Sequence, residues 1–171
     1  FFLESTHWMD ITFKGYVGYL IGGTSEQGYT TGKIFKTVNG GLLWDSVYYN
    51  NNFLFRKCNF VDSENGWITG NNGFMIRTTD AGHSWEELST KAKYHLNSVC
   101  FSDKMNGWTC GREGQILNTT NGGISWSAQM TGKPREHFND IVFLDSIHGW
   151  MSGTYGTILY TNLGGKDIKS K

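Results

Sequence analysis

The chain has 171 residues, enough for one domain with a hydrophobic core. Its 15 basic and 15 acidic residues balance, which excludes the electrostatic footprint of a nucleic-acid-binding protein. No apolar run is long enough to span a bilayer, whereas 23 glycines, one proline and 15% aromatic residues favour short, twisted strands joined by tight turns.

One sequence cassette recurs four times, at about residues 8–48, 55–89, 96–129 and 139–171. Each copy starts with a run that ends in phenylalanine, at Phe13, Phe60, Phe101 and Phe143. A glycine-aromatic pair follows, with its aromatic residue at Tyr19, Trp67, Trp108 and Trp150. The most regular part then begins at Gly32, Gly73, Gly114 and Gly156, which are spaced by 41, 41 and 42 residues. A stride this constant predicts a repeat protein.

The second repeat shows the predicted elements of each copy most clearly. Its four short runs are Arg56–Val61, Gly66–Gly70, Phe74–Thr79 and Ser84–Leu88, each rich in β-branched and aromatic residues and bounded by turn residues. Four antiparallel strands in about 40–45 residues form one blade of a propeller. The sequence therefore predicts an all-β propeller of four-stranded blades, with residues 1–171 as a single propeller region.

The ends of the chain fall at consecutive repeat positions, because Lys171 aligns with Leu88 and Phe1 with Ser89. We therefore expect a whole number of blades. Two architectures remain open at this stage: four blades that close into a small ring, or part of a larger propeller whose open faces would be large apolar surfaces.

The turn after the third strand has the pattern Thr-x-Asn/Asp-x-Gly-x-Ser-Trp. A side-chain oxygen at its third position can bond backbone groups across the turn, its glycine can adopt a positive φ, and its tryptophan can pack over the hairpin. The three clear copies are Thr37, Asn39, Gly41, Trp44; Thr78, Asp80, Gly82, Trp85; and Thr119, Asn121, Gly123, Trp126. In the fourth copy Leu163 and Ile168 replace the acid and the tryptophan, so we expect the motif to be lost there.

This turn resembles the Asp box of bacterial neuraminidase-type (BNR) repeats, and the whole cassette is similar to the repeats of photosystem II stability/assembly factors. That resemblance implies a non-catalytic protein-binding scaffold located outside the cytoplasm. For a photosynthetic host, it implies binding of an unassembled reaction-centre subunit. The alternative is a secreted carbohydrate-binding module, or the propeller portion of a sialidase-like glycosidase.

Catalytic and metal sites are not indicated. A sialidase needs clustered arginines, a tyrosine nucleophile and an acid, but this chain has four arginines and lacks the Arg-Ile-Pro signature of that family. The five histidines show no metal-ligand spacing. We therefore expect no enzyme activity, no cofactor and no metal.

Two cysteines fall on neighbouring predicted strands. If residues 103–107 form the turn between them, Cys100 lies opposite Cys110, and a cross-strand disulfide is one interpretation. The favoured interpretation is two small buried thiols on one face of the sheet.

The two faces of the predicted disc differ in character. The face with the links between blades and the turns between second and third strands combines basic residues with aromatic ones, as protein and glycan contact sites do. Its candidate binding residues are Lys91, Lys93, Tyr94, Arg112, Lys133, Arg135 and Tyr155. Tyr48, Phe53 and Phe138 are also expected there. A protein partner is favoured and a glycan is the alternative, and a homodimer could complete a larger ring.

Overall fold

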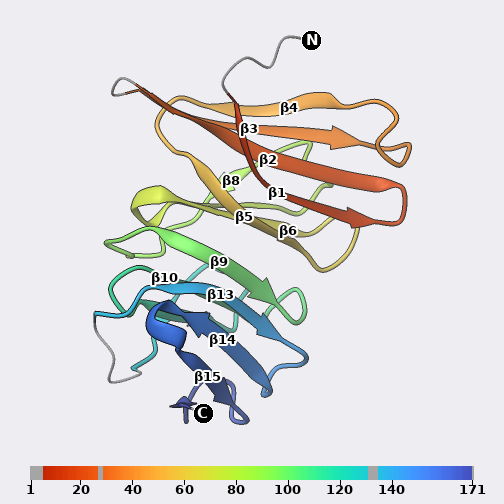
Figure 1. The fold of residues 1–171 in the computed structure, drawn as a ribbon. Helices are drawn as coiled ribbons and strands as arrows, with labels where there is room; N and C mark the ends of the chain where they lie inside the picture. The colour runs from red at the N-terminus through yellow and green to blue at the C-terminus, as the bar shows by residue number, and fades with distance from the viewer. Residues whose placement is uncertain (1–5, 27–28, 131–134, 171) are drawn as a thin grey trace.

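The computed structural model describes residues 6–26, 29–130 and 135–170, and Figure 1 shows them as four antiparallel sheets. Each sheet consists of four strands that are consecutive in sequence and paired in that order. The strands are β1 (His7–Lys14), β2 (Val17–Glu26), β3 (Tyr29–Thr37), β4 (Asp45–Asn50); β5 (Phe55–Phe60), β6 (Gly66–Gly70), β7 (Met75–Thr78), β8 (Glu86–Glu87); β9 (Leu96–Phe101), β10 (Gly107–Gly111), β11 (Ile116–Thr119), β12 (Ser127–Ala128); and β13 (Phe138–Phe143), β14 (Gly149–Gly153), β15 (Ile158–Thr161), β16 (Lys169–Ser170). The predicted all-β architecture of four-stranded blades is confirmed.

The four sheets form an open row. In Figure 1 the first sheet lies at the top and the fourth at the bottom, with the second and third between them. The first strands of the sheets contact one another in the order β1, β5, β9, β13. This arrangement favours part of a larger propeller over a closed four-bladed ring. None of the helices in the described residues is long and apolar enough to cross a membrane.

The core consists of three apolar layers, each between two neighbouring sheets. Ile21, Phe60 and Ile76 belong to the layer between the first and second sheets. The layer between the second and third sheets includes Trp67, Leu96 and Phe101, and the layer between the third and fourth sheets includes Trp108, Ile141 and Phe143. Sheets packed face to face in this way each need a neighbour on both sides to bury their apolar residues.

An aromatic contact repeats at each of these three layers. The second-strand aromatic residue of one sheet stacks on the phenylalanine that ends the first strand of the next sheet. The ring centroids are 3.9 Å apart for Tyr19–Phe60, 3.6 Å for Trp67–Phe101 and 3.6 Å for Trp108–Phe143. The polar atom of the same aromatic residue donates to a carbonyl in the turn after the third strand of the next sheet. These bonds are Tyr19 Oη to Ala81 O (2.7 Å), Trp67 Nε1 to Gly122 O (3.0 Å) and Trp108 Nε1 to Gly164 O (3.1 Å).

The glycine before each of these aromatic residues is required by close packing. At Gly66 an added Cβ would lie 2.3 Å from Cε1 of Phe60, whose ring is held by its stack on Tyr19. The repeated glycine-aromatic pair therefore has two roles: the glycine makes room for the phenylalanine of its own sheet, and the aromatic residue covers the phenylalanine of the next.

The Asp-box turn has the predicted geometry. In the second sheet Thr78 Oγ1 donates to Asp80 Oδ1 (2.9 Å) and accepts from the backbone N–H of Gly82 (2.8 Å). Asp80 also accepts from the backbone N–H of Ser84 (2.9 Å), and Gly82 has a φ of 78°. These bonds satisfy backbone groups that the ladder leaves unpaired at the turn.

The expectation that the fourth copy had lost this motif is only partly correct. Leu163 occupies the position of the acid, but Thr161 Oγ1 donates instead to Asp167 Oδ1 (2.6 Å). Thr161 Oγ1 still accepts from the backbone N–H of Gly165 (2.8 Å). A carboxylate four residues further along the chain therefore replaces the usual one.

Hydrogen bonds to turn carboxylates lower their pKa values. Bonds from the Ser84 side chain, and then from its backbone N–H, lower the pKa of Asp80 from 3.8 to about 2. The bond from His148, followed by bonds from backbone N–H groups, lowers the pKa of Asp145 from 3.8 to about 2. Because these pKa values are lower in the folded chain, their stabilising effect is complete above about pH 4 and is lost as the pH falls towards 2.

We therefore expect the melting temperature to fall between pH 4 and pH 2, and Asp80→Asn to reduce that fall without abolishing the turn. The same position holds Asn39 and Asn121 in other repeats, where each accepts a backbone N–H bond at 3.0 Å. Thermal melts of the two proteins at a series of pH values test this. Identical pH dependence in Asp80→Asn and the unmodified chain would show that Asp80 contributes nothing to acid lability.

The predicted register of the cysteine pair is wrong by two residues. The turn begins one residue earlier, because Ser102 N–H donates to Asn106 O (3.0 Å) while Asp103 Oδ1 caps it. Cys100 consequently pairs with Trp108, and Cys110 pairs with Ser98. All three cysteines are free and buried, and Cys100 and Cys110 lie in one apolar layer, as the favoured interpretation of two buried thiols requires.

Candidate functional site

Each of the four first strands contains a β-bulge at the same position. The pairing register shifts around Met9 in β1, Arg56 in β5, Asn97 in β9 and Asn139 in β13, each four residues before the repeated phenylalanine (Phe13, Phe60, Phe101 and Phe143). A bulge leaves one residue unpaired and redirects its side chain. The repeat therefore places four redirected side chains at one end of four adjacent strands.

These four bulge residues line one cavity of about 360 Å³. Three further residues complete its lining: Arg112 after β10, His137 before β13 and Thr154 after β14. The described residues that line the cavity include no carboxylate. The polar residues of this lining are two arginines, two asparagines, a histidine and a threonine, and the carboxylate of Glu113 lies 3.9 Å from Nδ1 of the lining residue His137.

The positive charge of Arg112 adds to the electrostatic cost of burying Arg56. Burial, and then the positive charge of Arg112, lowers the pKa of Arg56. The Arg56 Nη1 atom donates a long bond to Asn97 Oδ1 (3.5 Å), and its buried Nε has no partner among the described residues. A guanidinium group with a free donor beside a second positive charge is well suited to bind an anion, because the anion supplies the missing acceptor and offsets the repulsion.

The rings of two histidines beside the arginines accept hydrogen bonds from backbone N–H groups. His95 Nδ1 accepts from the backbone N–H of Asn72 (2.9 Å), and His137 Nδ1 accepts from that of Glu113 (3.3 Å). Burial, followed by the charges of Arg56 and Arg112, lowers the pKa of His95. His95 is therefore neutral at pH 7 and adds no positive charge beside the arginines.

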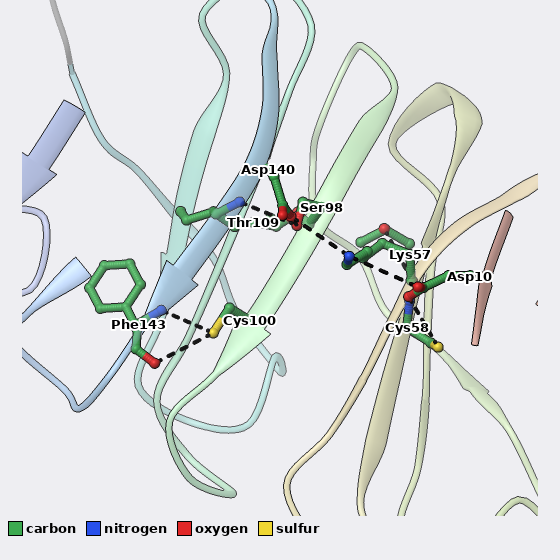
Figure 2. A network of polar contacts seen from close by, with 10 residues as sticks. Asp10, Lys57, Cys58, Ser98, Cys100, Thr109, Asp140 and Phe143 are labelled. Carbon is green, nitrogen blue, oxygen red and sulfur yellow. Dashed lines mark hydrogen bonds and ion pairs between the residues drawn. The ribbon is translucent and has the colours of Figure 1, made fainter. Parts of the chain in front are cut away.

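The residue after each bulge belongs to a polar network that links the four sheets beside the cavity. These residues are Asp10, Lys57, Ser98 and Asp140. Figure 2 shows Lys57 between two carboxylates from different sheets, with Nζ 3.9 Å from Asp10 Oδ1 and 3.8 Å from Asp140 Oδ1. Asp10 Oδ2 also accepts from the backbone N–H of Cys58 (2.9 Å), and Ser98 Oγ donates to Asp140. The first, second and fourth sheets are thereby linked through one lysine, which limits how far the bulge residues can move apart.

The links between sheets bond to the turns between second and third strands, so these two kinds of segment lie on one face, as expected, and its role in binding stays a prediction. For example, the backbone N–H of Arg112 donates to His95 O (3.1 Å), and that of Thr154 to His137 O (2.9 Å). Of the predicted binding residues, only Arg112 lines the cavity. Tyr94 and Tyr155 are exposed side chains outside it, as are Lys91, Lys93 and Arg135. Lys133 lies outside the described residues.

Part of the aromatic set predicted for this face belongs to the core. Phe138 is fully buried, and Phe53 stacks on Phe74 with ring centroids 4.1 Å apart. Tyr48 packs against the layer between the first and second sheets. These rings fill space between sheets because the links are short and lie over the apolar layers.

Sequence reasoning missed Arg56 as a site residue. The alignment of the repeats places it level with Met9, Asn97 and Asn139, but a strand residue at that position reads as one more alternating side chain. Only the bulge, a feature of pairing between strands, turns it towards the cavity.

The family model of the photosynthesis system II assembly factor YCF48 matches residues 3–96, more than half of the chain. The chain belongs to this family. The resemblance read from the repeats is thereby confirmed. Among curated proteins, none matches the chain.

Solved structures of the YCF48 family share the fold. A structure of YCF48 bound to a D1 peptide is 30% identical, has a TM-score of 0.62, and aligns over 68% of this chain and 39% of that one. The chain thus matches well under half the length of that relative. YCF48 from Cyanidioschyzon merolae is 15% identical with a TM-score of 0.59, over 99% of this chain and 86% of that one.

A glycosidase also shares this architecture. The GH74 xyloglucanase from Xanthomonas campestris is 10% identical with a TM-score of 0.64, over 91% of this chain and 28% of the enzyme. At that identity the likeness concerns the fold alone, since one propeller scaffold carries many unrelated functions.

Proposed function

We propose that this YCF48-family chain is a non-catalytic protein-binding module that holds a peptide carboxylate between Arg56 and Arg112. The observation that carries the proposal is one cavity that both Arg56 and Arg112 line, with no carboxylate in the described lining. A relative at 30% identity binds a D1 peptide, so a D1 peptide is the ligand with which this proposal is tested.

The chemistry of the cavity favours a carboxylate-bearing peptide. A guanidinium group binds a carboxylate through two parallel N–H···O bonds, which give both charge compensation and orientation. Asn97, Asn139 and Thr154 add amide and hydroxyl groups that match the backbone of an extended peptide. Burial of Arg56 strengthens its hydrogen bonds to the peptide carboxylate, because water competes less well for the donors of a buried guanidinium group.

The same lining supports the non-catalytic part of the proposal. Glycoside hydrolysis needs a pair of carboxyl groups, or a tyrosine with an acid partner, at the reacting bond. The described lining holds neither a carboxyl group nor a tyrosine.

A binding titration with a labelled D1 peptide tests this proposal. We expect Arg56→Gln and Arg112→Gln each to weaken binding by about 10- to 100-fold, as expected for the loss of a charge-assisted hydrogen bond. Lys104→Gln is the matched control, since Lys104 pairs with Asp62 (3.1 Å) in a turn remote from the cavity lining. Equal affinities in all four proteins would refute the carboxylate site.

A glycan-binding module predicts a different result. Binding to a glycan array that survives both arginine substitutions, and is lost on substitution of the exposed Tyr94 or Tyr155, would support the carbohydrate alternative and contradict this proposal.

A further inference from the structure

Glu113 occupies a turn position at which asparagine would be less strained. It lies between β10 and β11 with a φ of 55°, and the next residue, Gly114, has a φ of 68°. Two consecutive positive φ values are typical of a type I′ turn, for which Asn-Gly is a preferred pair. The second sheet has that pair at the same position, with φ values of 54° at Asn72 and 76° at Gly73. Because a glutamate is disfavoured in this left-handed region, the chemistry of the turn does not account for Glu113.

The side chain of Glu113 lies at the edge of the cavity. Its Oε1 atom is 3.9 Å from Nδ1 of His137, a residue of the cavity lining, and the residue before it, Arg112, also lines the cavity. Among the described residues, the carboxylate of Glu113 has an ion pair with His137 and with neither Arg56 nor Arg112. The cavity is therefore bordered by two positive charges from the arginines and one negative charge from Glu113.

An anion that enters the cavity interacts with all three of these charges. Two guanidinium groups by themselves favour phosphate, because a dianion gains about twice as much Coulomb energy from them as a carboxylate does. The repulsion by Glu113 is also about twice as large for a dianion as for a monoanion. A binding site can gain selectivity by repelling the wrong ligand as well as by contacting the right one.

We propose that Glu113 is a specificity-determining residue, which keeps the cavity selective for a carboxylate over a phosphate group. This inference rests on the proposed carboxylate site and adds the rejection of dianions to it. Removal of the Glu113 charge should strengthen binding of both kinds of anion, because it removes a repulsion. The gain should be about threefold for a monoanion and about tenfold for a dianion, since the two free-energy changes differ by a factor of about two and the carboxylate is partly exposed.

Competition with a labelled D1 peptide tests the inference, with acetate and inorganic phosphate as the competing anions at constant ionic strength and at about pH 8, where phosphate is a dianion. We expect Glu113→Gln to raise the affinity for phosphate about tenfold and that for acetate about threefold. Glu113→Asn should do the same without lowering the melting temperature, because Asn72 already has this conformation in the second sheet. The matched control is Glu87→Gln, which removes an exposed carboxylate of β8 outside the cavity lining and should change neither affinity.

The arginine variants separate failure of this inference from failure of the carboxylate site. Where Arg56→Gln and Arg112→Gln weaken binding of the D1 peptide, equal gains for both anions in the two Glu113 variants, or no gain for either anion, would overturn the inference alone. Peptide binding that is indifferent to both arginine substitutions, or a peptide that neither anion displaces, would overturn the carboxylate site and this inference with it. Thermal melts show whether each variant is folded, and Glu113→Asn replaces Glu113→Gln should that variant not fold.

Discussion

Trp67→Ala is expected to lower the free energy of unfolding by about 3–5 kcal/mol, the range for deletion of a large buried aromatic side chain. Trp67 is 1% exposed and lies between two sheets, stacked on Phe101 with centroids 3.6 Å apart. Its removal opens a void in the layer that joins the two halves of the row. The carbonyl of Gly122 keeps a partner, because Arg77 Nη1 also donates to it (3.1 Å), so the loss is mainly one of packing.

Urea unfolding measures this effect, and the repeat supplies a matched control. Trp150→Ala makes the same chemical change at the same repeat position, but its side chain is 38% exposed in this structure, and it should cost less than about 1 kcal/mol. Trp67→Phe retains a ring and loses the donor, and should lie between the two. Comparable losses for Trp67→Ala and Trp150→Ala would mean that the layers between sheets do not hold this fold together.

The second large effect concerns the charge of the cavity. The double variant Arg56→Glu/Arg112→Glu should abolish detectable binding of a D1 peptide, because a site built for a carboxylate would then repel it. Affinity should fall by at least about 100-fold, the combined loss of two charge-assisted contacts. Isothermal titration calorimetry checks the affinity, and thermal melts check that the fold is intact.

Charge reversal at basic residues outside the cavity provides the comparison for the double arginine variant. Reversing Lys91, Lys93 and Arg135 together changes more charge than the double variant does, but these residues lie outside the cavity lining. We expect them to slow association, and to weaken binding less than the two arginines do, since exposed charges at the edge of a site mainly affect the rate of encounter. A triple variant that binds as poorly as the double variant would move the binding site to the outer loops.

Much of the fold could be predicted because its causes are local and repeated. The stride of the glycines, the glycine-aromatic pairs and the Asp-box turns each depend on residues within one sheet, and the strands came within a few residues of their observed bounds. The fourth Asp box was misjudged because Asp167 reaches the turn from outside the motif. The register of the cysteine pair was misjudged because the turn runs from Ser102 to Asn106, one residue earlier than predicted, with Asp103 as its cap.

The sequence by itself determined that four similar blades form and which residues anchor each one, since a hairpin with its capping carboxylate and tryptophan is specified within about 40 residues. Only the tertiary structure decided where the site lies. Arg56 and Arg112 come from different sheets, and both line one cavity because the bulge in β5 turns Arg56 towards the end of the row where Arg112 follows β10. The tertiary structure also decided that the row stays open, because closure depends on how the sheets pack against one another, and no single repeat encodes that packing.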